Sequence, residues 1–152
     1  MAFTEEQENK IISQTLDIIN EKFKNNQETT IVDDTIYHIL NIITVMGSNN
    51  NPIKLLDVLA PNTKDAFKLI GANKFGKIIN DHYKQVFTEY QNSRGLFKSF
   101  KFKKIAISIL NTMYEKIEQE NEKHDLISEY LIPYIMDNYK DNINLGENDE
   151  SI

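Results

Sequence analysis

Apolar residues recur every three or four positions along most of this 152-residue chain, and that spacing matches one face of an α-helix. The first such stretch runs from Ile11 to Phe23, and Thr4 and Gln7 precede it with the spacing of a helix capping box. Strand signals are few, and the best of them, residues 97–103, has no partner run, so we expect a loop there. The sequence therefore predicts an all-α fold, an irregular single-domain bundle of six to seven helices.

Glycine, proline and asparagine residues between the apolar stretches set the expected helix boundaries. The second helix is expected to begin near Asp33 and Asp34, whose carboxylates favour the positive end of the helix dipole, and to stop at Gly47. A last helix should follow Asp125, and Pro133 should kink or split it. The helices between these two are expected at residues 52–59, 63–70, 73–90 and 102–121.

The same pattern predicts the core and the domain limits. Residues 1–140 are expected to form one helical bundle domain, followed by an acidic, flexible tail over residues 141–152. A chain of this length can bury enough surface to fold without disulfides, and it has no cysteine. Eight residues on apolar helix faces are predicted to be mostly buried: Ile39, Leu40, Ile43, Ile79, Val86, Ile105, Ile109 and Met113.

The charge of the chain changes sign twice along its length. Residues 1–50 carry 3 Lys and 8 Asp or Glu, while residues 51–104 carry 11 Lys or Arg and 4 Asp or Glu. Residues 105–152 carry 3 Lys and 11 Asp or Glu, so the net charges are −5, +7 and −8. The overall charge of −6 therefore hides a basic middle, which favours a partner of opposite charge or self-association of acidic with basic faces.

The densest basic region is residues 94–104, where five basic residues are interleaved with three phenylalanines. Lysines there could neutralise phosphates while exposed rings stack on bases, or the segment could lie on an acidic protein or an anionic membrane. If the rings enter the core instead, the lysines extend to water and the segment is purely structural. The residues that we predict to contact a partner are Arg94, Phe97, Lys98, Phe100, Lys101, Lys103 and Lys104.

Residues 71–77 match the Gly-x-x-x-x-Gly-Lys part of a phosphate-binding loop. The next position of such a loop is Ser or Thr, whose hydroxyl binds Mg²⁺, whereas this chain has Ile78. The residues before the motif are typical of a helix and not of a buried strand. We therefore interpret the two glycines as a junction between helices, with Lys74 and Lys77 exposed.

No group of residues predicts a catalytic centre, a metal site or a cofactor. His38, His82 and His124 are not spaced as metal ligands on one helix face, and His38 lies within an apolar helix. The absence of cysteine excludes thiolate ligands and a cysteine nucleophile. We therefore expect no cofactor.

These observations favour a non-enzymatic helical interaction or adaptor protein that binds a macromolecular partner, most simply a protein, through residues 94–104. Two alternatives stay open. The first is an RNA- or DNA-binding module that uses Lys98, Lys101, Lys103 and Lys104. The second is an enzyme whose site is assembled from residues distant in sequence. The charge layout is also compatible with a homo-oligomer.

The remaining sequence signals concern location and source. No stretch reaches 18 apolar residues, so we expect no transmembrane segment, and the N-terminus lacks the layout of a signal peptide. The expected location is the cytoplasm or a host-cell cytosol. Sixteen Lys against one Arg, with abundant Ile and Asn, indicate a low-GC genome and suggest an accessory protein of a virus, phage or parasite.

Overall fold

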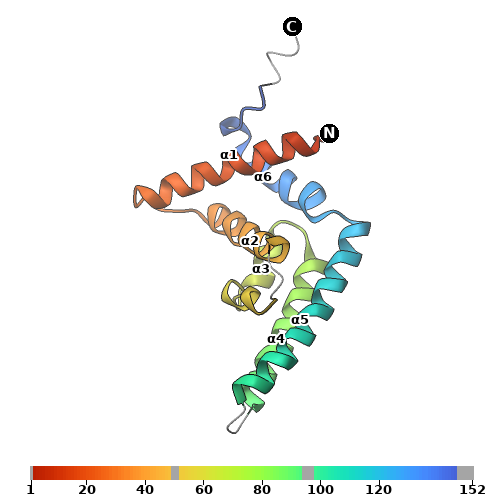
Figure 1. Ribbon diagram of the computed structural model, residues 1–152. Helices are drawn as coiled ribbons and strands as arrows, with labels where there is room; N and C mark the ends of the chain where they lie inside the picture. Colours follow the sequence, from red (N-terminus) through yellow and green to blue (C-terminus); the bar gives the residue numbers. More distant parts are fainter. Residues whose placement is uncertain (1, 49–51, 94–97, 147–152) are drawn as a thin grey trace. The chain divides into compact units, whose positions relative to one another are not determined.

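The computed structural model describes residues 2–48, 52–93 and 98–146 (Figure 1). Within these ranges there are six α-helices, joined or followed by short 3-10 and π-helical segments, and no strand. The predicted all-α bundle of six to seven helices is therefore confirmed. The contacts divide the chain into two compact units, one of residues 1–37 with 125–152 and one of residues 38–124.

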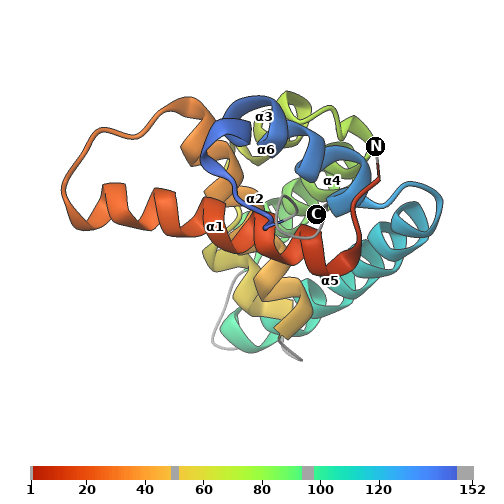
Figure 2. The ribbon, with the colours of Figure 1, turned by 90° about the horizontal axis from the view of Figure 1, so that it is seen from above.

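The first unit brings the N-terminal helix together with the last helix of the chain. α1 (Glu5–Lys24) packs against α6 (Ile132–Tyr139), and the course of α1 is clearest in Figure 2. Thr4 Oγ1 accepts from the backbone N–H of Gln7 at 3.1 Å, and Gln7 Oε1 accepts from the N–H of Thr4 at 2.9 Å. The predicted capping box is thus confirmed, and it fixes where α1 begins.

A second capping box starts α2 (Ile31–Ser48) earlier than expected. Thr30 Oγ1 accepts from the N–H of Asp33 at 3.1 Å, and Asp33 Oδ2 accepts from the N–H of Thr30 at 2.9 Å. Asp33 is therefore the third residue of the helix and not the residue before it, because its carboxylate reaches back to the cap. The division between the two units falls within α2, between Tyr37 and His38.

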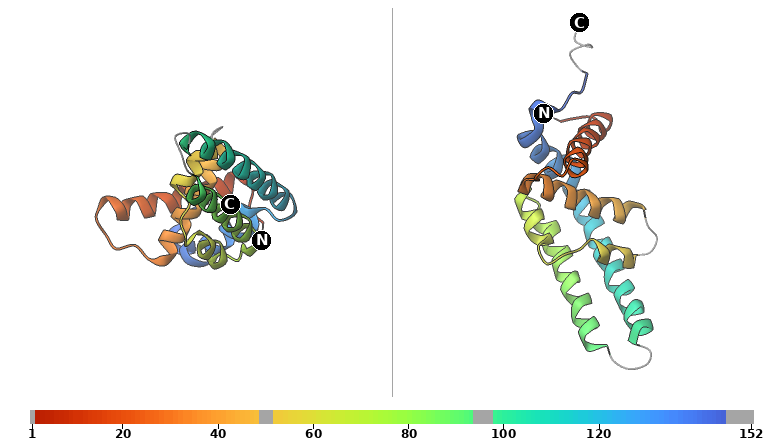
Figure 3. Two further views of the ribbon diagram at one scale, coloured as in Figure 1. Left: turned by 90° about the horizontal axis from the view of Figure 1, so that it is seen from below. Right: turned by 90° about the vertical axis from the view of Figure 1, so that its left-hand side faces the viewer.

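The second unit is built around a long helical hairpin. α4 (Asn73–Asn92) and α5 (Lys98–Lys123) pack along one another, and Figure 3 shows the two helices side by side. η1 (Pro52–Asp57), a 3-10 helix, contacts α5, and α3 (Thr63–Leu69) packs against α4. The side chains that these helices bury most completely are Leu55, Phe67, Phe75, Ile79, Leu110 and Met113.

The core prediction is right for most residues and wrong for one face of α5. The predicted residues that are buried are Ile39, Leu40, Ile79, Val86 and Met113. Ile43 and Ile109 are only half-buried, and Ile105 is 39% exposed. The buried stripe of α5 instead includes Ala106 and Leu110, both 0% exposed. Apolarity favours the isoleucine stripe, but the sides of α5 that α4 and η1 cover decide which stripe is buried.

The first turn of α5 corrects the expected loop over residues 97–103. The chain is helical from Lys98 onward, so the phenylalanines and lysines of this segment follow a helical and not an extended spacing. An interrupted alternation such as this is compatible with either structure, and pairing with a second strand would have been needed to favour the extended one. Residues 94–97 lie outside the described ranges.

The last helix is divided near Pro133, as predicted. Asp125 Oδ1 accepts from the N–H of Ser128 at 2.8 Å and caps η2 (Leu126–Leu131), a π-helical segment. α6 then begins with Pro133 in its first turn, where the missing N–H of proline leaves no helical hydrogen bond unmade. The division therefore follows from proline chemistry.

The residues after α6 are held by α1. η3 (Lys140–Asn142) is a short 3-10 helix, and the backbone of Asn144 then pairs with the side-chain amide of Gln14. Gln14 Nε2 donates to the Asn144 carbonyl at 2.5 Å, and the Asn144 N–H donates to Gln14 Oε1 at 2.7 Å. The acidic tail over residues 141–152 stays a prediction, and residues 147–152 lie outside the described ranges.

Candidate functional site

The α4–α5 hairpin carries most of the residues that the sequence predicts to contact a partner. Lys101, Lys103 and Lys104 lie in the first turns of α5, and all three side chains are exposed. Phe100 precedes them and is 75% exposed. Lys98 is the first residue of α5. We call Phe100, Lys101, Lys103 and Lys104 the basic tip.

Two of the predicted contact residues cannot be placed. Arg94 and Phe97 lie outside the described ranges, between the end of α4 and the start of α5. The structure therefore brings four predicted residues together with described side chains on one stretch of helix, and these four are the basic tip. The spacing along α5 spreads them around the helix, because successive residues point about 100° apart.

Tyr90 of α4 packs beside the first turns of α5, and the sequence interpretation did not include it. Tyr90 packs edge-on against the half-buried Phe102, with ring centroids 5.2 Å apart and an interplanar angle of 76°. Tyr90 is still 51% exposed, and Phe87 is 52% exposed. Tyr90 follows the buried Ile79 by about three turns of helix, so helical spacing by itself places it on the buried side of α4 and gives no signal of its exposure.

The electrostatics of the basic tip favour an anion. The first turn of α5 contains no acidic residue, whereas the first turn of α1 contains Glu5, Glu6 and Glu8. The amino end of a helix carries a partial positive charge, so lysines placed there add to that charge and do not offset it. A surface that supplies carboxylates or phosphates would relieve this arrangement.

The glycine-rich motif is a junction between two helices, as interpreted from the sequence. Gly71 follows α3 with φ of +87°, a conformation that side chains with a Cβ rarely adopt. Gly76 lies within α4, where an added Cβ would stand 2.9 Å from Phe67 Cβ. The exposed Lys77 pairs with Asp81 at 2.8 Å, one turn along the same helix. Each glycine thus has a local packing or backbone role.

The two histidines within the helices of the second unit are bound to neutral groups. His82 is 4% exposed, and its Nδ1 donates to the backbone carbonyl of Ile78 at 2.6 Å. His38 Nε2 lies 2.8 Å from Thr63 Oγ1, which also accepts from the N–H of Ala60 at 2.9 Å. The Thr63 hydroxyl hydrogen can therefore donate to a neutral His38 ring. Burial lowers the pKa of His38 below its ordinary value of 6.5, which favours that neutral form.

A buried ion pair joins α1 to the start of α2 within the first unit. Lys22 Nζ lies 2.7 Å from Asp33 Oδ2, and the Asp33 side chain is completely buried. Burial by itself raises the pKa of Asp33, but the hydrogen bonds from Lys22 and from the Thr30 N–H outweigh it, so that the pKa lies below its ordinary value. Asp33 Oδ1 has no hydrogen-bond partner among the described residues. This pair is part of the α2 cap.

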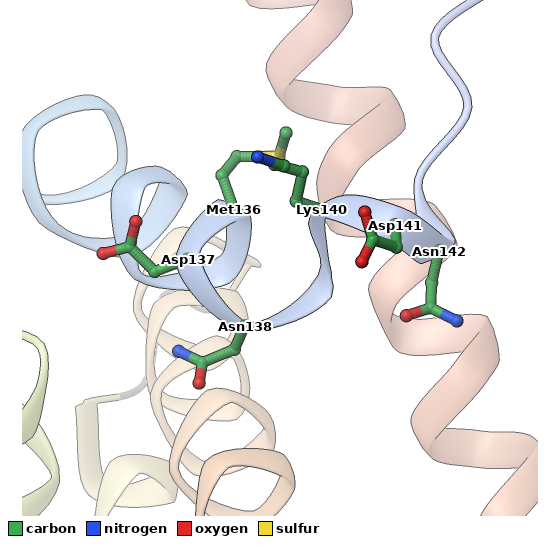
Figure 4. A pocket seen from close by; sticks show the side chains of 6 residues that line it. All are labelled: Met136, Asp137, Asn138, Lys140, Asp141 and Asn142. Carbon is green, nitrogen blue, oxygen red and sulfur yellow. The ribbon is translucent and has the colours of Figure 1, made fainter.

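A small polar cavity of about 220 Å³ lies at the end of α6. Its lining includes Asp137 and Asp141, but Figure 4 shows their carboxylates well apart and not converging on one point. Lys140 extends toward Met136 between them. In the part of the chain that the structure describes, no three His, Asp or Glu side chains are grouped so that they could hold a metal ion. The cavity therefore lacks convergent ligands.

Comparison of the chain with protein-family models, with curated proteins and with solved structures finds no match in any of the three. Among the described helices, none combines the length and the apolar character needed to cross a membrane. A functional proposal therefore depends on the exposed side chains, and the α4–α5 hairpin carries the most distinctive of them.

Proposed function

We propose that this chain is a non-enzymatic interaction protein whose basic tip binds an acidic surface of a partner protein. The observation that carries the proposal is Phe100, a large apolar ring that is 75% exposed beside three exposed lysines. Burial of a phenylalanine side chain is worth about 1.5–3 kcal/mol, so a partner that covers this ring gains affinity from it. Lysines around the ring then select the charge of the partner.

The position of the basic tip at the amino end of α5 supports an acidic partner. Three like charges and the positive end of the helix dipole lie together, and no acidic residue of the first turn offsets them. Partner carboxylates would reduce the repulsion among Lys101, Lys103 and Lys104 while they gain charge-assisted hydrogen bonds. The expected partner surface therefore combines Asp or Glu side chains with an apolar area that fits a phenylalanine ring.

Affinity capture from the native source with a matched pair of variants tests this proposal. The test variant changes Lys101, Lys103 and Lys104 to Ser, and the control variant changes three exposed lysines elsewhere in the second unit to Ser: Lys64, Lys68 and Lys74. Both variants lose the same charge. We expect the test variant alone to lose the captured partner, and we expect wild-type capture to weaken steeply with salt. Equal capture by both variants would remove the basic tip from consideration.

Phe100→Ala separates a binding role from a structural one. Because the ring is 75% exposed, its removal should leave the free energy of unfolding almost unchanged while it weakens partner binding. Thermal unfolding followed by circular dichroism measures the first quantity, and titration of the purified partner measures the second. A large loss of stability without a loss of binding would contradict the proposal.

A second candidate is single-stranded nucleic acid, and the same exposed ring favours it. A base can stack on Phe100 while Lys101 and Lys104 contact phosphates, and one stacked base is worth about 1–3 kcal/mol. The acidic remainder of the chain disfavours this candidate, because it repels phosphates at long range. Fluorescence anisotropy of labelled RNA and DNA oligonucleotides, titrated at several salt concentrations, distinguishes the two. Saturable binding that Phe100→Ala weakens would favour nucleic acid over protein.

The proposal includes a cytosolic location. The chain has no cysteine, whereas secreted domains of modest size commonly rely on disulfides. The lysine-rich and isoleucine-rich composition supports a low-GC source and an accessory role of the kind found in viruses, phages and parasites. Fractionation of the native cells, followed by immunodetection of the chain, tests the location.

A further inference from the structure

The α4–α5 hairpin carries a groove that the basic tip does not use. The groove has a volume of about 480 Å³, and its walls come from both helices of the hairpin. Two isoleucines of α5 supply its apolar part, and Ile105 is 39% exposed although it was predicted to be in the core. The residues that line the groove are Lys84, Gln85, Thr88, Glu89, Ile105 and Ile109.

The groove faces away from α3. α3 approaches α4 closely at Gly76, where an added Cβ would meet Phe67 and the carbonyl of Lys64. Gln85 follows Gly76 by about two and a half turns of helix and therefore projects from the opposite side of α4. Ile105 and Ile109 thus form an apolar face on a side of the hairpin that α3 leaves open.

The α4 wall of the groove carries one positive and one negative charge. Lys84 and Glu89 lie on this wall, and neither takes part in the ion pairs observed among the described residues. A two-fold axis perpendicular to α4 between these positions would place each Lys84 opposite Glu89 of a second copy. A parallel arrangement would instead place Lys84 opposite Lys84 of the second copy. The charge pattern is therefore self-complementary in the antiparallel arrangement alone.

We propose that two copies of this chain associate through this groove, with their hairpins antiparallel across a two-fold axis. Ile105 and Ile109 of both copies form the apolar centre, and reciprocal Lys84–Glu89 pairs lie at its edge. An interface confined to one groove of this hairpin is small by the standard of specific interfaces, which bury about 1,200–2,000 Å² in total, so we expect a reversible dimer with a concentration-dependent mass.

This dimer uses other residues than the function proposed for the basic tip. Lys101 and Lys104 lie within one helical turn of Ile105, so the tip borders the groove but supplies neither its apolar centre nor its charge pairs. Self-association of an acidic with a basic face would instead use the tip. The variant with Lys101, Lys103 and Lys104 changed to Ser distinguishes the two, because it should not weaken the groove dimer, whereas it should abolish tip-mediated association.

Charge reversal at the edge of the groove tests the proposal. Sedimentation velocity of the full chain over a range of concentrations measures the dimer dissociation constant. Lys84→Glu and Glu89→Lys should each weaken the dimer about tenfold or more, because either change places like charges opposite one another twice. An equimolar mixture of the two single variants should regain the dimer, since the heterodimer pairs opposite charges at both positions. The double variant should regain it as well.

A change at the apolar centre provides the second measurement. Ile105→Asp should abolish the dimer, whereas the control Leu69→Asp, at a 47% exposed position of α3, should leave it unchanged. Circular dichroism checks that each variant is folded. If Ile105→Asp is unfolded, the charge reversal at the exposed Lys84 still tests the proposal. A wild-type mass of one chain up to millimolar concentration would refute the proposal, and so would a dimer that the single charge reversals leave unchanged.

Discussion

Replacing Gly76 with alanine sets two physical effects against each other at the contact between α3 and α4. Alanine is favoured over glycine within a helix by about 1 kcal/mol, so the substitution should stabilise an uncrowded position. At Gly76, however, the new Cβ would stand 2.9 Å from Phe67 Cβ and 3.3 Å from the carbonyl oxygen of Lys64. Ordinary contacts between carbon atoms are about 3.5–4.0 Å, so the two helices must separate by roughly 0.6–1 Å.

The crowding at Gly76 should outweigh the gain in helix propensity. Neither neighbouring atom can move by rotating a side chain, because one is the Cβ of the fully buried Phe67 and the other belongs to the backbone. Overpacking of a core typically costs about 1–3 kcal/mol, and a rigid contact of this kind falls in the upper half of that range. After subtraction of the propensity gain, Gly76→Ala should lower the free energy of unfolding by about 1–2 kcal/mol.

Gly47 provides the matched control for this prediction. It lies in α2, it is exposed, and an added Cβ would meet nothing within 4 Å. Gly47→Ala should therefore raise stability by up to about 1 kcal/mol. Urea unfolding followed by circular dichroism measures both variants, and the expected loss at Gly76 corresponds to a midpoint shift of about 0.5–1 M. A Gly76→Ala protein that is as stable as Gly47→Ala would refute the reasoning about this contact.

Three further predictions concern the core and the buried titratable groups. Leu110→Ala should lower the free energy of unfolding by about 3–5 kcal/mol because Leu110 is fully buried, whereas Ile105→Ala should lower it by less than about 1 kcal/mol under dilute conditions. Denaturant titration measures both variants, and the reverse order would show that the buried face of α5 is assigned wrongly. The pKa of Asp33 lies below its ordinary value, so the pair contributes stability at neutral pH that is lost as the pH falls below about 4; the stability difference between wild type and Asp33→Asn should shrink over that range. The pKa of His38 is lower in the folded than in the unfolded chain, so the unfolded chain binds a proton more readily and the free energy of unfolding should decline as the pH falls through about 6.5. A His38→Gln variant with the same pH profile of stability would contradict this.

Helix starts were predictable because the groups that define them are neighbours in sequence. The capping box of Thr4 with Gln7 and the cap at Asp125 each need only residues three positions apart. Pro133 divides the last helix for a reason contained in its own ring. α2 shows the limit of such reasoning, since Asp33 is attractive as a helix start and serves instead as the third residue of a box that begins at Thr30.

The sequence indicated where along the chain the candidate site lies, but not which of its side chains are exposed. The density of lysine and phenylalanine in residues 94–104 indicated a contact segment, yet whether Phe100 is buried or exposed depends on the side of α5 that faces α4. The exposed ring of Tyr90 comes from α4, and no local spacing linked it to that segment. Only the pairing of the two helices brings Tyr90 beside Phe102.

The sequence by itself determined the helical class, the caps and the change of charge along the chain, because each depends on residues close together in the chain. The tertiary structure decided which of two neighbouring apolar stripes on α5 is buried, and so left Ile105 at the surface while Ala106 and Leu110 entered the core. It also decided that Gly76 must be glycine, since the constraint is the approach of Phe67 from α3. Helical periodicity predicts that an amphipathic helix buries one face, but the packing of the neighbouring helices determines which face that is.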